Sequence, residues 1–248
     1  MREIPAGAIL VRSLGWAALA WRMTILIASL LTLAIQPSAA MDQDAYQLNR
    51  QGRELLDRHR YPAAVEVFRL AVDRAVSELG PMDPATAMIR RNLALAYTQT
   101  GDSAAAEQSA KLALSAMESR FGPADPGLTP ILNVLAECYA SSGKIEEAER
   151  VSGQAIAIGQ SAGVHFGIAL HNLGALREFS GDAVGAASFY RRAIVVKTES
   201  LGAAHPHVQM SKAALRRVDH GRLISVNQKR PLILELAGSG QVPQVPGL

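Results

Sequence analysis

The six histidines and the single cysteine are the residues of this 248-residue chain with the most distinctive chemistry. His205 and His207 flank Pro206, with no nearby acidic residue or cysteine to complete the four ligands of a structural zinc site. His165 and His171 lie six residues apart, a spacing that does not bring two side chains to one face of a helix. We therefore expect no metal site.

Cys138, between Glu137 and Tyr139, falls beside an apolar helical stripe, where a buried thiol behaves as a small hydrophobic side chain. Motifs for a phosphate loop, a Gly-x-Ser-x-Gly nucleophile or a His-Glu-x-x-His zinc helix do not occur in the sequence. These observations predict that the chain is not an enzyme and needs no cofactor.

Asparagine recurs at intervals of 43, 41 and 39 residues, at Asn49, Asn92, Asn133 and Asn172. An amide side chain has both a donor and an acceptor, so a row of them can pair with the main chain of an extended peptide. The alternative is that they bond to neighbouring helix ends or face water, as polar residues on exposed helix faces usually do.

These asparagines belong to a longer repeat. His59, Gly101, Gly143 and Gly181 are separated by 42, 42 and 38 residues, and four further columns keep the same intervals. The columns are Gly52, Ala94, Ala136 and Gly174; Ala64, Ala106, Ala148 and Ala186; Phe68, Ala110, Ser152 and Tyr190; and Ala71, Ala113, Ala155 and Ala193. Such self-similarity is typical of a stack of small structural units.

Each unit reads as a hairpin of two helices. A small residue in the first helix lets two backbones approach closely, and a turn residue, usually glycine, follows seven positions later. Asp102 and Asp182 come directly after that turn, where an N-cap oxygen would hold the first amides of the second helix. The Gly-Pro pairs Gly80-Pro81 and Gly122-Pro123 mark unit ends.

The pattern Leu93-Ala94-x-x-Tyr97-x-x-x-Gly101 and its counterpart Leu135-Ala136-x-x-Tyr139-x-x-x-Gly143 resemble the tetratricopeptide repeat. The 42-residue period is similar to the kinesin light chain subtype. The resemblance implies an all-α fold, a right-handed superhelical solenoid of about four antiparallel helix hairpins with a C-terminal capping helix. We expect units at about 45–82, 85–124, 127–162 and 165–204, within a repeat domain at 41–222 that ends in a cap at 207–222. Where small residues such as Ala110 and Ser152 replace an aromatic, we expect looser packing.

In such a stack the first helices line a concave groove, which is the expected binding surface. Arg53 and Arg91 would favour an acidic or C-terminal carboxylate group of the ligand through bidentate pairing. The predicted peptide-binding residues are Asn49, Arg53, Arg91, Asn92, Gln99, Asn133, Glu137, His171, Asn172 and Glu178.

The two ends of the chain differ from the repeat. The N-terminal segment has the features of a signal peptide: three arginines, an apolar run from Met23 to Ile35 and the small residues Pro37-Ser38-Ala39-Ala40. It predicts a signal peptide at 1–40 and export to the periplasm or outside a bacterial cell. An uncleaved membrane anchor is the alternative, and translation could also start at Met23. Residues 223–248 form the predicted flexible tail.

Charge argues against nucleic acid as a partner. Of 25 basic and 22 acidic residues, three basic and one acidic residue precede position 41, which leaves a nearly neutral balance of 22 to 21. Membrane contact is expected only through an uncleaved N-terminal segment or the basic C-terminal end.

The sequence thus predicts an exported adaptor or scaffold that binds an extended peptide segment of a protein partner, with oligomers an open question. The alternatives are a self-assembling structural scaffold of the cell envelope and, less favoured, a metal-binding or enzymatic protein.

Overall fold

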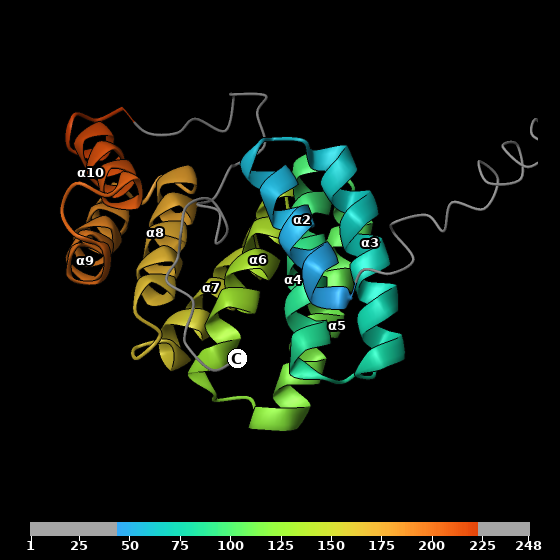
Figure 1. Ribbon diagram of the computed structural model, residues 1–248. Coiled ribbons are helices and arrows are strands. Elements are labelled where there is room, and N and C mark those ends of the chain that lie inside the picture. The colour runs from blue at the N-terminus through green and yellow to red at the C-terminus, as the bar shows by residue number, and fades with distance from the viewer. Residues whose placement is uncertain (1–43, 223–248) are drawn as a thin grey trace, which may run out of the picture. The chain divides into compact units, whose positions relative to one another are not determined.

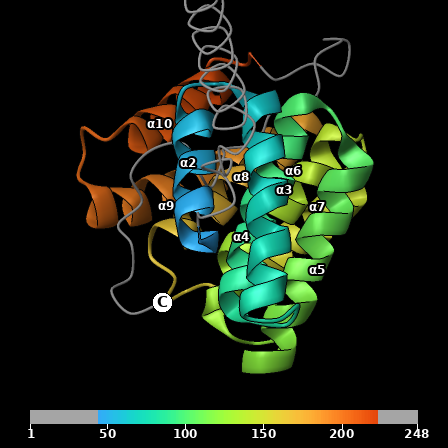
Figure 2. The same ribbon diagram turned by 45° about the vertical axis from the view of Figure 1, so that its right-hand side comes forward.

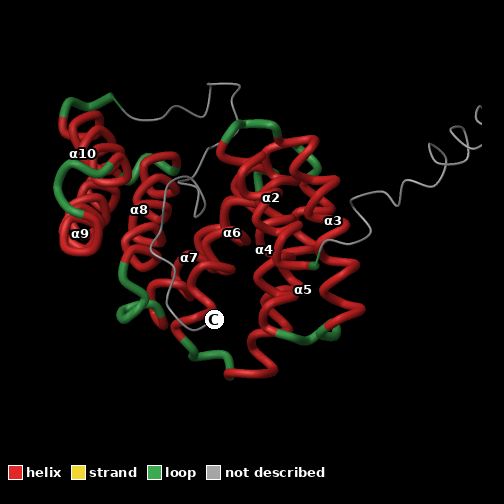
Figure 3. The backbone as a smooth tube through the Cα atoms, viewed as in Figure 1, coloured by secondary structure: helices red, strands yellow, loops and turns green. Residues whose placement is uncertain are grey.

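The structure, a computed structural model, describes residues 44–222. The predicted signal peptide and flexible tail lie outside these residues. Within the described range every regular element is a helix (Figure 3), which confirms the all-α prediction. The elements are α2 (Ala45–Asp57), α3 (Tyr61–Glu78), α4 (Pro84–Thr100), α5 (Ser103–Phe121), η1 (Pro126–Leu128), α6 (Thr129–Ser141), α7 (Ile145–Ile158), α8 (Val164–Phe179), α9 (Ala183–Leu201) and α10 (Pro206–Asp219).

The helices pair in chain order as antiparallel hairpins, α2 with α3, α4 with α5, α6 with α7 and α8 with α9, and α10 packs on α9 (Figures 1 and 2). Consecutive first helices also touch, α2 with α4, α4 with α6, α6 with α8 and α8 with α10, whereas the second helices α3, α5, α7 and α9 make no comparable contacts with one another. The first helices therefore contact one another in succession along the stack. We call the surface that they form the inner face.

The turn inside each hairpin needs a left-handed residue. Gly101, Gly143 and Gly181 have φ values of 83°, 78° and 86°, as the spacing predicts. In the first hairpin His59 takes the same place with φ of 56°, the one non-glycine residue of the described range with positive φ. Its ring Nδ1 lies 2.8 Å from the Tyr61 hydroxyl, a contact that helps to hold this unfavourable backbone conformation.

Aspartates cap two of the helices that follow these turns, α5 and α9. Asp102 accepts a hydrogen bond from the amide of Ala105, and Asp182 from that of Gly185. The N-termini of α3, α6, α7 and α8 have no side-chain cap. At α8 the N-cap residue is Gly163, in the segment where the third repeat is shorter than the others.

Where the two helices of a hairpin cross, the side chains of two repeat columns compensate each other in size. Where the first helix carries glycine, at Gly52 and Gly174, the second carries an aromatic ring, Phe68 or Tyr190, and both rings are fully buried. A Cβ on Gly52 would lie 2.5 Å from Phe68 Cε1, and one on Gly174 would lie 2.9 Å from Tyr190 Cε1.

In the two middle hairpins the first helix carries alanine, and the second carries a small residue. These pairs are Ala94 with Ala110 and Ala136 with Ser152, and each of the four residues exposes 1% or less of its surface. Ala110 and Ser152 are thus buried as fully as the rings at the other two crossings. The looser packing expected there stays a prediction.

We expect Gly52→Ala to destabilise the chain by about 1–3 kcal/mol, because the added methyl group overlaps a buried ring. In a Phe68→Ala background, which reproduces the pairing of Ala94 with Ala110, the same change should be neutral or stabilising by up to about 1 kcal/mol, since alanine favours helix more than glycine does. Thermal unfolding followed by circular dichroism measures both effects. Equal destabilisation in both backgrounds would contradict the size matching.

Candidate functional site

The predicted binding residues form a line of contacts from one first helix to the next. Asn92 Nδ2 donates to Asn49 Oδ1 at 2.8 Å, which joins α4 to α2. Gln99 Nε2 donates to Glu137 Oε1 at 3.2 Å and joins α4 to α6. Asn133 Nδ2 donates to the main-chain oxygen of His165 at 2.9 Å and joins α6 to α8. These side chains thus tie neighbouring repeats together.

The contacts continue into the capping helix. Glu178 is fully buried and accepts two hydrogen bonds from Arg217 of α10, both at 2.7 Å, and one from the Tyr190 hydroxyl at 2.8 Å. The carboxylate of Glu178 raises the pKa of Arg217, which is the expected effect of a bidentate ion pair. His171 Nδ1 lies 3.0 Å from Ser211 Oγ, also on α10. At this end the predicted residues hold the cap in place.

Burial divides the ten predicted residues into two groups. Arg53 is exposed, and Asn49, Arg91 and Gln99 are half-buried, all on α2 and α4. Six residues expose 7% or less of their surface: Asn92, Asn133, Glu137, His171, Asn172 and Glu178. The residues of the inner face that a partner can reach therefore lie on α2 and α4. We define the α2–α4 site as these four residues, Asn49, Arg53, Arg91 and Gln99, together with the buried Asn92, which bonds to Asn49 and Arg91.

Arg91 is the most unusual cation of this site. Its Nε and Nη2 donate to Asn92 Oδ1 at 3.2 and 2.6 Å, and no carboxylate of residues 44–222 lies within ion-pair distance. Burial lowers the pKa of Arg91 to about 10, and the neighbouring positive charge of Arg53 acts in the same direction. A guanidinium that has lost water without gaining a carboxylate is costly, unlike the paired Arg217. An anion from outside the described chain would offset that cost.

Within the described residues no group of three or more His, Cys, Asp or Glu side chains is placed to hold a metal ion. Cys138 is buried, and burial raises the pKa of its thiol to about 12, the opposite of what a nucleophile requires. Its Sγ lies 3.2 Å from Thr98 Oγ1.

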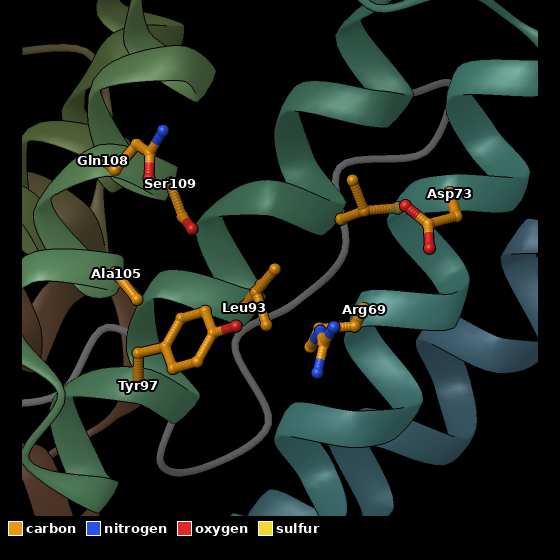
Figure 4. Close-up of a pocket in the computed structure, with 8 residues that line it drawn as sticks. Arg69, Asp73, Leu93, Tyr97, Ala105, Gln108 and Ser109 are labelled. Carbon is orange, nitrogen blue, oxygen red and sulfur yellow. The ribbon is translucent and has the colours of Figure 1, made fainter.

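A depression lies between the second helices α3 and α5, on the side of α4 away from the inner face (Figure 4). It is a cleft of about 230 Å³. Its lining consists of Arg69, Val72, Asp73, Leu93, Tyr97, Ala105, Gln108 and Ser109. Figure 4 shows Leu93 and Tyr97 between the charged residues of α3 and the polar residues of α5. Arg69 already faces Glu66 at 3.6 Å, so this cleft offers no unpaired cation.

The fold defines a class of protein, a stack of helical hairpins. Residues 47–119 match the family described as "Tetratricopeptide repeat". These residues, which span most of α2 to α5, are therefore tetratricopeptide repeats, as the columns predict.

Solved structures with the same fold include two of nearly identical TPR-like repeats assigned to a kinesin light chain of Podosopora anserina. One of them, a point variant, shares 18% identity over 71% of this chain and 84% of its own, with a TM-score of 0.58. The other shares 18% over 72% and 88%, also with a TM-score of 0.58. BtubC (BKLC) from P. vanneervenii shares 24% over 66% and 68%, with a TM-score of 0.54.

No curated protein matches the chain significantly. In the described residues no helix has both the length and the apolar composition to cross a bilayer. Tetratricopeptide repeat proteins are in general adaptors rather than enzymes, and the fold is a scaffold for protein–protein interaction.

Glu137 gives a test of the buried contacts on the inner face. It exposes 2% of its surface, and its Oε2 is buried without a hydrogen-bond partner among residues 44–222. Burial raises the pKa of Glu137 from 4.5 to about 8. The folded chain therefore keeps a proton that the unfolded chain releases above pH 4.5, so stability falls as pH rises from there to about 8.

We expect Glu137→Gln, which cannot ionise, to match the parent near pH 4.5 and to exceed its stability by about 3–5 kcal/mol near pH 8. Glu146→Gln, on an exposed position of α7, is the matched control and should leave the pH dependence unchanged. Thermal unfolding across this pH range measures the difference. If the stability of the parent and of Glu137→Gln changed with pH in the same way, ionisation of the buried carboxyl would not be what destabilises the parent at higher pH.

Proposed function

We propose that the chain is a protein-interaction module that binds an extended peptide segment of a partner along its inner face. In this proposal a carboxylate of the partner, from an acidic side chain or the C-terminus, lies at Arg91 and Arg53. The observation that supports it most strongly is the half-buried guanidinium of Arg91, which has an amide partner and a neighbouring cation but no carboxylate within residues 44–222.

The amides beside Arg91 suit the main chain of such a peptide. The Asn49–Asn92 hydrogen bond uses one acceptor of Asn49 and one donor of Asn92, which leaves the Asn49 amide group and a second Asn92 N–H without a described partner. Binding through these amides does not depend on the side chains of the ligand. Asn92, Asn133 and Asn172 are all buried, whereas Asn49 is half-buried, so we place the amide contacts at Asn49 in the α2–α4 site rather than along the whole row.

The test is the affinity of peptides selected from a library of acidic and free-carboxylate sequences. We expect Arg91→Ala combined with Asn92→Ala to weaken binding at least about tenfold, because the charge-assisted hydrogen bonds are lost. Amidating the peptide carboxylate should weaken binding to the parent chain to a similar extent and have little further effect on the double variant.

Arg69→Ala, in the cleft between α3 and α5, is the matched control and should bind as the parent does. Circular dichroism verifies that each variant is folded. Unchanged affinity after both inner-face substitutions would reject the α2–α4 site, and loss of binding in Arg69→Ala alone would move the binding surface to the opposite side.

We also propose export, on the basis of the apolar run and small residues before position 41. A fusion of the first 45 residues to alkaline phosphatase, which is active only outside the bacterial cytoplasm, should be active, and the mature chain should begin at Met41. An inactive fusion would reject export, and an exported chain that keeps residues 1–40 in the membrane fraction would favour the uncleaved anchor.

A further inference from the structure

The accessible part of the inner face carries apolar as well as charged side chains. Tyr46 precedes Asn49 by three residues and Arg53 by seven, so these side chains share one face of α2, and Tyr46 exposes 59% of its surface. Met88, three residues before Arg91, is half-buried on the same side of α4. The α2–α4 site therefore has large apolar side chains on the same helix faces as its two arginines.

The chain itself contains a segment of complementary composition. Residues 231–236 read Pro-Leu-Ile-Leu-Glu-Leu, and they lie outside the described residues. Glu235 is the one acidic residue of positions 223–248, and it follows a run of three aliphatic residues and precedes a fourth. In an extended chain successive side chains alternate between two sides, so an extended segment would present Ile233 and Glu235 to the same surface. Such a segment offers one carboxylate and one aliphatic side chain together.

The chain between the cap and this segment is long enough to reach the α2–α4 site. α10 contacts α8, α8 contacts α6 and α6 contacts α4, so three helix-to-helix steps separate the cap from Arg91 (Figure 1). These steps amount to about 24–30 Å at about 8–10 Å each. Glu235 lies 13 positions after Arg222, and an extended chain of that length spans up to about 43 Å.

The difference also allows for a displacement along the helix axes. Arg91 lies nine residues before the last residue of α4, Thr100, which corresponds to about 14 Å of helix. Combined at right angles with about 30 Å across the stack, this gives a separation of about 33 Å, still within reach of the extended chain.

We propose that residues 231–236 bind to the α2–α4 site of the same chain. The Glu235 carboxylate lies between Arg53 and Arg91, and the neighbouring aliphatic side chains pack against Tyr46. This inference rests on the proposed function, because it places a segment of the chain where the carboxylate of a partner binds. The segment then competes with the partner, which reaches the two arginines only by displacing it.

Charge and tethering both favour this occupant. A carboxylate beside Arg91 offsets the cost of its lost hydration, as the carboxylate of Glu178 does for Arg217 at the other end of the stack. Because the segment is tethered to α10, its effective concentration at the site is on the order of millimolar. A second copy of the chain would have to reach a similar concentration to bind there equally often.

A nitroxide spin label on Ala237→Cys reports where the segment lies, since Cys138 is buried and does not take up the label. In the ¹⁵N-labelled chain we expect the amide signals of α2 and α4 around Arg53 and Arg91 to be broadened. Adding Glu235→Gln should restore them. Glu146→Gln, the same change at an exposed position of α7, is the matched control and should leave the broadening as it is.

The competition is measured with the pentapeptide acetyl-Ala-Glu-Ala-Glu-Ala, which has a free C-terminal carboxylate, as the probe in an NMR titration without the spin label. We expect Glu235→Gln to bind the probe about three- to tenfold more tightly than the parent, which is the factor for a site that the segment fills about 70–90% of the time. Glu146→Gln should bind the probe as the parent does.

Equal affinities of the parent and Glu235→Gln, with unbroadened signals in α2 and α4, overturn the inference, while Arg91-dependent binding of the probe still supports the proposed function. Broadening that arises only when a spin-labelled chain is mixed with a ¹⁵N-labelled one assigns the site to a second copy and overturns the intrachain contact. A probe that binds neither chain rejects the carboxylate site proposed for partners, and the broadening then decides by itself whether the segment lies there.

Discussion

The size matching at the hairpin crossings is the constraint on which the rest of the structure depends. A glycine opposite a buried ring, or an alanine opposite a small residue, sets how closely the two helices of each hairpin approach. That separation places the first helices near enough to touch their neighbours, while the second helices stay apart. The inner face, with its polar contacts from α2 to α10, exists because the hairpins stack in this one way.

The polar residues of that face do two different things. Toward α10 they are paired, and the ion pair of Arg217 with Glu178 is a structural contact that fixes the cap. Toward α2 the same kind of cation, Arg91, is partly desolvated, and within residues 44–222 its partners are an amide and a second arginine nearby. A buried charge is tolerated when it is paired, so the contrast between these two arginines is the physical basis for placing a ligand carboxylate at one of them and not at the other.

Much of the fold could be predicted from the sequence because the determinants are local. A turn that requires positive φ, an aspartate that caps the next helix and a small residue at the crossing each mark their own position, and His59 adopts the left-handed conformation that its column requires. Gly52 and Phe68 are also visible in the sequence as members of two columns of equal spacing. That their sizes compensate does not follow from the sequence, because nothing in the spacing says that the two columns touch.

The functional residues are harder to predict. A helical stripe gives the direction of a side chain but not how closely the next helix covers it, so the pattern places Asn133 and Glu137 on an open surface, whereas both are buried. The binding role of the row remains a prediction.

The most direct measurement is photo-crosslinking in cells from two glutamine positions that lie close in the sequence and on opposite sides of the stack. Gln99 is on the inner face and Gln108 lines the cleft between α3 and α5. With a photoreactive amino acid at each position in turn, we expect a discrete partner adduct from position 99, lost on adding Arg91→Ala, and none from position 108. An adduct from position 108 alone would contradict the central claim that partners bind along the first helices.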